Sequence, residues 1–195
     1  MTNETKVQYL QRAAIACIIA GLGYFYFGFP FWFLNATDEI DAHEIAPFVL
    51  VSNNLLGVWA AGISGIAMFI AAYSFQKIGE PTAKRGFFYV LMVGATCAFL
   101  STWFILPFAP LGAIFNGIGM VLVGIASLKA RIWAGWRRYA PLIVGCFPFI
   151  FMFPLVILFG QRQPVMIGLW SIPWALLGLA AWQRAKELTL NNGIK

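Results

Sequence analysis

The chain has 195 residues, of which 61% are hydrophobic and 10% are charged. An ordinary soluble domain is about 45–50% apolar and about 25% charged, so this composition excludes a soluble globular protein. The net charge of +6 does not indicate a nucleic-acid partner, because the positions of the cations along the chain have a simpler explanation in a membrane.

Six apolar runs follow one another along the chain, and most reach the roughly 20 residues that cross a hydrocarbon core. They cover residues 13–34, 47–75, 86–106, 111–128, 139–159 and 165–182. The longest connection, Asn35–Ala46, has twelve residues, which is too short for an independent core. The sequence therefore predicts an all-α membrane protein in which residues 1–195 form a single domain, a bundle of six transmembrane helices.

Basic residues are concentrated in alternate connections. Twelve of the thirteen Lys and Arg residues precede the first run or follow the second, fourth and sixth, and Arg162 is the exception. Short loops rich in Lys and Arg face the cytoplasm, where they also meet anionic lipid headgroups. We therefore predict a plasma-membrane or inner-membrane protein with both termini cytoplasmic. The first run is a retained span, because its 22 residues exceed the about 7–15 of a signal peptide.

The spans can pair into three antiparallel hairpins, since the even-numbered runs share a similar exit that passes from small residues to a basic one. A threefold repeat explains this likeness, but so do snorkelling and aromatic anchoring at a membrane boundary. Small residues spaced like Gly94 and Ala98 predict close contacts between helices. Pro148, Pro154 and Pro173 predict kinks or local openings in the last two spans.

The interiors of the runs lack ionisable groups, with no Asp, Glu, Lys, Arg or His well inside any of them. Ion-coupled transporters usually bury such a group near the membrane midplane, so we predict a protein without ion coupling. A zinc hydrolase is also disfavoured, because the chain has one His. Cys17, Cys97 and Cys146 fall at different depths of three runs and predict no shared site or disulfide. We expect no metal and no cofactor.

Neutral polar residues, in contrast, gather at one depth, about 6–10 Å below the non-cytoplasmic ends of the spans at helical rise. The members of this outer polar layer are Asn53, Asn54, Ser101, Thr102, Asn116 and Ser171. One interpretation is an outward-facing pocket that binds or passes a small or lipid-like molecule. The other is hydrogen bonding between helices, worth about 0.6 kcal/mol per contact, which is the more frequent role of such residues.

The connection above this layer holds four of the seven acidic residues and the only His. Its candidate catalytic residues are Asp38, Asp41, His43 and Glu44. In a second hypothesis they perform acid–base chemistry for a membrane-embedded isomerase or cyclase acting on an apolar substrate. The simpler interpretation is a solvated acidic loop, since the spacing matches no metal motif. The sequence leaves open whether the chain is an enzyme.

The segment Arg131–Tyr139 alternates cations with aromatic residues. Single-strand nucleic-acid sites have this composition, but an aromatic belt beside positive anchors at the inner membrane boundary explains it better. A third hypothesis is an accessory or assembly subunit of a membrane complex, with which 19 Phe, 6 Tyr and 8 Trp residues are compatible. The expected partners are thus the lipid bilayer, a small apolar or amphiphilic ligand, and a membrane protein or a second copy of the chain, but no nucleic acid.

Overall fold

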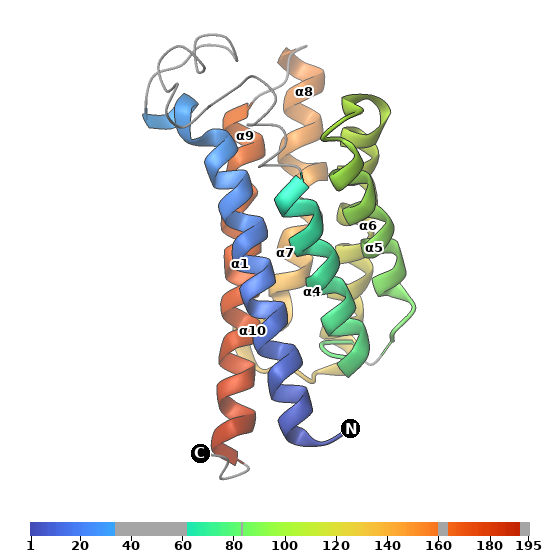
Figure 1. The fold of residues 1–195 in the computed structure, drawn as a ribbon, viewed down its shortest axis with the longest axis vertical. Coiled ribbons are helices and arrows are strands. Elements are labelled where there is room, and N and C mark those ends of the chain that lie inside the picture. Colours follow the sequence, from blue (N-terminus) through green and yellow to red (C-terminus); the bar gives the residue numbers. More distant parts are fainter. Residues whose placement is uncertain (34–61, 83, 160–163, 192–195) are drawn as a thin grey trace.

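The computed structural model describes residues 1–33, 62–82, 84–159 and 164–191, and over these ranges the chain forms helices and no strand (Figure 1). The all-α fold predicted from composition is confirmed for these ranges. Three stretches, Pro107–Ala130, Gly135–Leu155 and Met166–Leu190, are long and apolar enough to cross a membrane.

The helices occur in chain order, with two short irregular turns between them. They are α1 (Asn3–Phe33), α4 (Ser64–Ile78), α5 (Phe87–Leu100), α6 (Ile105–Ala130), a 3₁₀ turn (Gly135–Tyr139), α7 (Ala140–Phe147), a π turn (Pro148–Met152), α8 (Phe153–Phe159), α9 (Pro164–Leu169) and α10 (Ser171–Asn191). The first helix begins at Asn3, ten residues before the apolar run, so its first turns are polar.

The boundary between the third and fourth predicted runs is wrong. The third run was expected to extend to residue 106, but α5 ends at Leu100 and α6 already begins at Ile105. Pro107 falls in the first turn of α6, where backbone N–H groups have no helical partner and a proline removes nothing. The apolar residues before Pro107 therefore belong to the fourth helix rather than to the third.

The last two apolar runs open near Pro148 and Pro173 as predicted, whereas Pro154 falls in the first turn of α8. The π turn that begins at Pro148 separates α7 from α8, which is a usual way for a helix to bend at proline. Pro173 lies in the first turn of α10 and leaves the carbonyl of Leu169, four residues earlier, without its helical donor. Helix α9 ends at that residue, and α10 restarts after a turn at Trp170.

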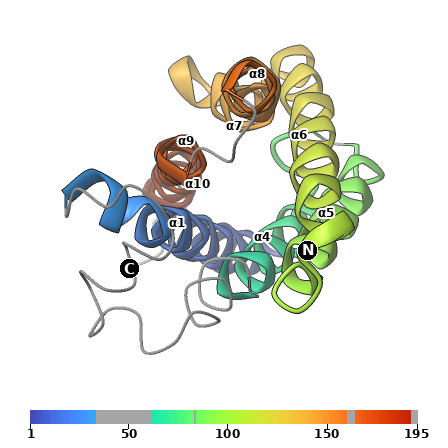
Figure 2. The same ribbon diagram turned by 90° about the horizontal axis from the view of Figure 1, so that it is seen from above.

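The helices form a ring in chain order (Figure 2). Helix α1 packs against α4, α4 against α5, α5 against α6 and α6 against α7, and α10 closes the ring against α1 and α7. Glycines permit the closest approaches. A Cβ atom added to Gly94 would lie 2.6 Å from the backbone nitrogen of Asn116, and one on Gly124 would lie 2.6 Å from the Cα of Leu142. The close contact predicted at Gly94 is confirmed.

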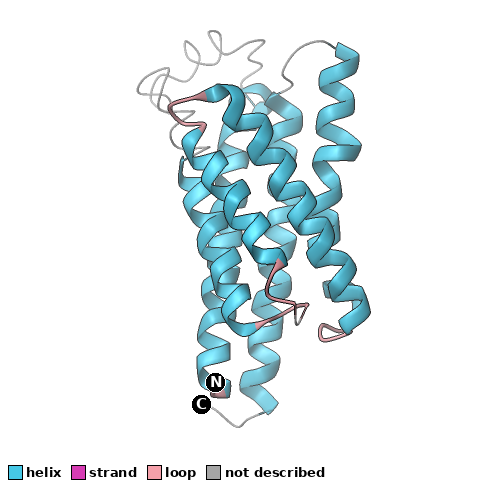
Figure 3. Ribbon diagram, turned by 90° about the vertical axis from the view of Figure 1, so that its right-hand side faces the viewer, coloured by secondary structure: helices cyan, strands magenta, loops and turns pink. Residues whose placement is uncertain are grey.

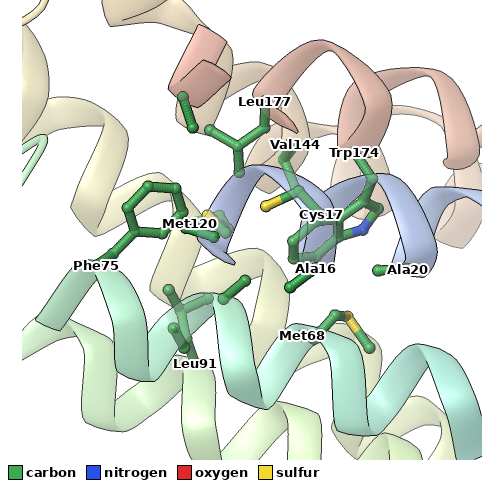
Figure 4. Close-up of a cluster of buried hydrophobic side chains, with 14 of the residues drawn as sticks. Ala16, Cys17, Ala20, Met68, Phe75, Leu91, Met120, Val144, Trp174 and Leu177 are labelled. Atoms are coloured by element: carbon green, nitrogen blue, oxygen red, sulfur yellow. The ribbon is translucent and has the colours of Figure 1, made fainter. Parts of the chain in front are cut away.

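Apolar side chains fill the inside of the ring (Figure 4). The buried residues converging there include Cys17, Met68, Phe75, Leu91, Met120, Val144, Trp174 and Leu177. The indole Nε1 of Trp170 donates a hydrogen bond of 3.0 Å to the carbonyl of Val144, which ties the start of α10 to α7. Cys17, Cys97 and Cys146 are all free thiols.

One end of the ring carries the charge. Helix α1 begins and α10 ends at this basic end, which lies at the bottom of Figures 1 and 3, and the connections after α4 and α6 lie there too. The cations of the described chain all belong to it: Lys6, Arg12, Lys77, Lys84, Arg85, Lys129, Arg131, Arg137, Arg138, Arg184 and Lys186. Arg162 and Lys195 lie outside the described residues.

Candidate functional site

Two members of the outer polar layer and all four candidate catalytic residues lie outside the described residues. This applies to Asn53 and Asn54 of the outer polar layer and to the candidate catalytic residues Asp38, Asp41, His43 and Glu44. Their roles stay predictions. The remaining members of the layer, Ser101, Thr102, Asn116 and Ser171, can be placed.

Ser101 and Thr102 form the turn that follows α5. The hydroxyl of Ser101 donates a 2.7 Å hydrogen bond to the carbonyl of Ala98 in its own helix. The buried Oγ1 of Thr102 has no hydrogen-bond partner among the described residues. It lies 3.3 Å from the position that a Cβ atom on Gly62 would take. Thr102 thus faces the segment leading into α4, whereas Ser101 only caps α5.

Asn116 is the layer member with the largest unmet hydrogen-bonding demand. Its side chain lies in the middle of α6, packs over Gly94 of α5 and is 1% exposed. Neither Oδ1 nor Nδ2 has a hydrogen-bond partner within the described ranges. Burying an amide in this state costs about 1–3 kcal/mol. A polar group from a ligand, a water or another part of the chain would recover that cost.

Ser171 lies apart from the other placed members. It is buried at the start of α10, where its carbonyl oxygen would lie 2.9 Å from a Cβ atom on Gly21 of α1. Thr102 faces the segment before α4 and Asn116 faces α5, so Thr102, Asn116 and Ser171 each contact a different neighbouring segment. The contacts described here do not join them in one hollow.

A groove that sequence reasoning missed runs between α1 and α4. This α1–α4 groove has a volume of about 550 Å³. The buried Ala16 and Ala67 lie in it beside the partly exposed Ile15, Ile19, Ile66 and Ile70. Short side chains between branched ones leave a furrow along the helix contact. The sequence signal was the alternation of Ala and Ile at neighbouring positions of both helices.

A smaller hollow of about 330 Å³ continues the groove along α1 toward the far end of the ring. Ile19 and Ile63 line both hollows, and Leu22 and Tyr26 line only the second. The two hollows therefore form one elongated depression beside α1.

The end of the groove near the basic end is polar. Gln8, Gln11 and Arg12 line it from successive positions of one face of α1. The Arg12 guanidinium lies 5.4 Å from the centre of the Tyr9 ring and forms no ion pair with a carboxylate of the described chain. Guanidinium and carboxamide N–H groups are hydrogen-bond donors, so this end suits an anionic oxygen group.

A second, smaller furrow lies on the other side of α4. This α4–α5 groove has a volume of about 180 Å³ and is lined by Gly65, Phe69, Ala95, Thr96 and Phe99, together with Ile66 and Ile70. The Thr96 hydroxyl donates to the carbonyl of Met92 at 2.8 Å, so the furrow is effectively apolar. Ile66 and Ile70 form a ridge with one groove on each side.

A partly buried ion network closes the basic end. Its members, here called the basic-end network, are Glu80, Trp133, Arg137, Arg184 and Glu187. The Glu80 Oε2 accepts hydrogen bonds from Trp133 Nε1 at 2.9 Å and from Arg184 Nε at 3.2 Å. Glu187 accepts from Arg184 at 3.5 Å and from Arg137. Glu80 is 6% exposed and Trp133 is 1% exposed, so the central contact is shielded from water.

Local structure turns these side chains inward. Gly79 ends α4 with a φ of 71° and donates its N–H to the Phe75 carbonyl at 2.9 Å, a left-handed cap that glycine adopts without strain. The chain then presents Glu80 to Trp133, whose ring meets Phe75 edge-on at 6.0 Å. The network thus ties the connections after α4 and α6 to the end of α10.

This arrangement changes the interpretation of Arg131–Tyr139. Trp133 and Arg137 are buried members of the network rather than residues of an aromatic belt, whereas Trp136 and Tyr139 remain exposed as a belt requires. The reason lies in two acids distant in sequence, because Glu80 accepts a hydrogen bond from Trp133 and Glu187 accepts one from Arg137. Within the described ranges no group of three His, Cys, Asp or Glu comes together in a way that would hold a metal ion.

Comparison of the chain with protein-family models, with curated proteins and with solved structures finds no match.

Proposed function

We propose that the chain is a multi-pass membrane protein with six spans, and that it binds a lipid-like molecule in the α1–α4 groove without ion coupling. The three long apolar stretches support the membrane assignment. So does α1, which has no charged residue from Ala13 to Phe33. The second span then includes α4 and the residues before it.

The proposed orientation places both termini in the cytoplasm, across a plasma or inner membrane. Its support is the gathering of the described cations at the basic end, together with the rule that positive loops stay cytoplasmic. The far end of the ring then faces outward.

The observation that carries the proposed binding function is the amphiphilic lining of the α1–α4 groove. Its volume of about 550 Å³ falls within the range of about 300–1,000 Å³ for small-molecule sites. Polar donors gather at one end and branched apolar side chains cover the remainder. Ile15 and Ile66 are each 50% exposed, so the groove is open along the surface that would meet hydrocarbon. An amphiphile can enter it sideways from the bilayer.

Binding at the surface is favoured over passage through the ring. Met120, Val144 and Trp174 are among the buried side chains that occupy the centre (Figure 4), and interiors packed in this way transmit no solute without rearrangement.

A second, outward-facing polar site remains a candidate, formed by Asn53, Asn54, Ser101, Thr102, Asn116 and Ser171. The unpaired amide of Asn116 and hydroxyl of Thr102 favour it. No observation on the described residues favours the membrane-enzyme or accessory-subunit hypotheses over lipid binding.

Filling the groove tests the proposed function. Ile15→Trp places a large ring in the groove, and Ile143→Trp is its control on α7, because Ile143 is similarly exposed at 43%. We expect Ile15→Trp to weaken binding of the fluorescent single-chain carboxylate cis-parinaric acid about tenfold, measured by probe fluorescence with the full chain in mild detergent. Equal affinities of the two variants would exclude the groove as the binding site.

A further inference from the structure

We infer that the ligand of the α1–α4 groove is a two-chain anionic phospholipid of the cytoplasmic leaflet. Its phosphate lies at Arg12, and its two acyl chains lie on either side of the ridge formed by Ile66 and Ile70. This inference rests on the proposed function, because it names the ligand class of the same groove.

Charge and position support an anionic headgroup. Arg12 lies at the basic end of the groove, which Gln8 and Gln11 also line, and it forms no ion pair with a carboxylate of the described chain. A guanidinium binds phosphate oxygens through two parallel hydrogen bonds. In the proposed orientation this end meets the cytoplasmic headgroup layer, which is rich in anionic lipid.

The length of the depression matches one leaflet. From Arg12 to Leu22 the rise along α1 is about 15 Å, which is half of the roughly 30 Å hydrocarbon core. Arg12 lines the polar end of the groove, and Leu22 lines its continuation. An acyl chain that starts at a phosphate bound to Arg12 can therefore follow α1 to the bilayer midplane.

The ridge supports a second chain. Ile66 and Ile70 line both grooves, so the α4–α5 groove lies at the same height as the middle of the α1–α4 groove. The two acyl chains of one glycerolipid can separate and pass on either side of this ridge, which is only one helix face wide. The α4–α5 groove is smaller, about 180 Å³ against 550 Å³, and accommodates only part of the second chain, beside Phe69 and Phe99.

Native mass spectrometry of the full chain, exchanged into mild detergent with defined lipids, tests the headgroup. We expect dioleoyl phosphatidylglycerol to bind about tenfold more tightly than dioleoyl phosphatidylcholine. Arg12→Gln should reduce this preference about fivefold, the effect of one cation at an anionic surface. The matched control Lys129→Gln removes an exposed cation at the end of α6, away from the groove, and should leave the preference unchanged.

The same measurement tests the number of chains. Thr96→Trp fills the α4–α5 groove from an exposed position, and Thr96→Phe is a milder second variant. We expect either variant to weaken dioleoyl phosphatidylglycerol binding about fivefold while leaving oleoyl lysophosphatidylglycerol unaffected. Ile15→Trp should weaken both lipids.

The outcomes separate the two proposals. One outcome is that Ile15→Trp loses binding while the affinity depends neither on the headgroup nor on Thr96→Trp, or fails to depend on one of them. This outcome overturns the anionic two-chain ligand and leaves the proposed function standing. Unchanged binding of all three lipids to Ile15→Trp overturns both. If Arg12→Gln leaves the headgroup preference unaltered, Arg12 does not bind the phosphate, and the inference is overturned.

Discussion

Arginines occur in two contrasting settings at the same end of this molecule. In the basic-end network, Arg137 donates to Glu187, and Arg184 donates to both Glu80 and Glu187. The indole N–H of Trp133 also donates to Glu80. At the polar end of the α1–α4 groove, Arg12 lies over the Tyr9 ring and near Gln8 and Gln11, and it has no carboxylate partner within the described ranges. A count of positive charges does not distinguish these arginines, but their surroundings in the folded chain differ.

The difference teaches how to separate structural cations from functional ones. A buried carboxylate that has been removed from water requires its cation, and removing either partner leaves an uncompensated charge. An exposed cation without an internal partner adds little to folding and keeps its donors for a ligand. The network should therefore determine stability, and Arg12 should determine lipid selectivity.

The largest expected effect follows from removing Glu80. Glu80→Ala takes away the acceptor shared by Arg184 and Trp133, so we expect the free energy of unfolding to fall by about 3 kcal/mol. Thermal unfolding in detergent, followed by circular dichroism, measures the change. Glu4→Ala removes an exposed carboxylate at the same end and is the control. If both variants unfold at one temperature, the network has no structural role.

An intermediate effect is expected at Trp133. Trp133→Phe keeps a ring against Phe75 but deletes the N–H that donates to Glu80, and a hydrogen bond to a charged group contributes about 2 kcal/mol. Trp136→Phe, at a position 42% exposed, should change stability by less than about 0.5 kcal/mol. The same unfolding measurement compares the two. A larger loss in Trp136→Phe would contradict the assignment of Trp133 to the network.

The smallest expected effect on stability is at Arg12, and it sharpens the contrast most directly. Arg12→Gln should alter the free energy of unfolding by no more than about 0.5 kcal/mol. Arg137→Gln, which breaks the contact with Glu187, should cost about 1 kcal/mol. Unfolding of the two variants in matched, lipid-free detergent provides the comparison. A loss in Arg12→Gln equal to that in Arg137→Gln would show that Arg12 also serves the fold.

Local features of the chain were predictable. The all-helical structure followed from uninterrupted apolar runs, and the openings near Pro148 and Pro173 followed from the missing backbone donor of proline. The boundary between α5 and α6 was misplaced because Ile105 and Leu106 are apolar and continue the third run, although they begin the next helix. Hydropathy indicates that a residue lies in an apolar environment, but it does not indicate to which of two consecutive helices the residue belongs.

The site was less predictable. The sequence predicted a site in the outer polar layer, where Asn116 is buried without a partner among the described residues, and this stays a prediction. It did not reveal the α1–α4 groove, because the groove depends on how two helices are rotated against each other. Ile15 and Ile66 look like ordinary lipid-facing residues until Ala16 and Ala67 are seen to pack between them.

The sequence by itself determined that the chain is helical and apolar, and it placed the cations in alternate connections, because hydropathy and loop charge act over short stretches of chain. Only the tertiary structure decided which cations are paired and which remain available. Glu80 and Arg184 are 104 positions apart, whereas Arg12 is exposed and has no carboxylate partner among the described residues. Pairing of this kind depends on distances across the folded ring, and these distances cannot be read from the residues that are adjacent in the sequence.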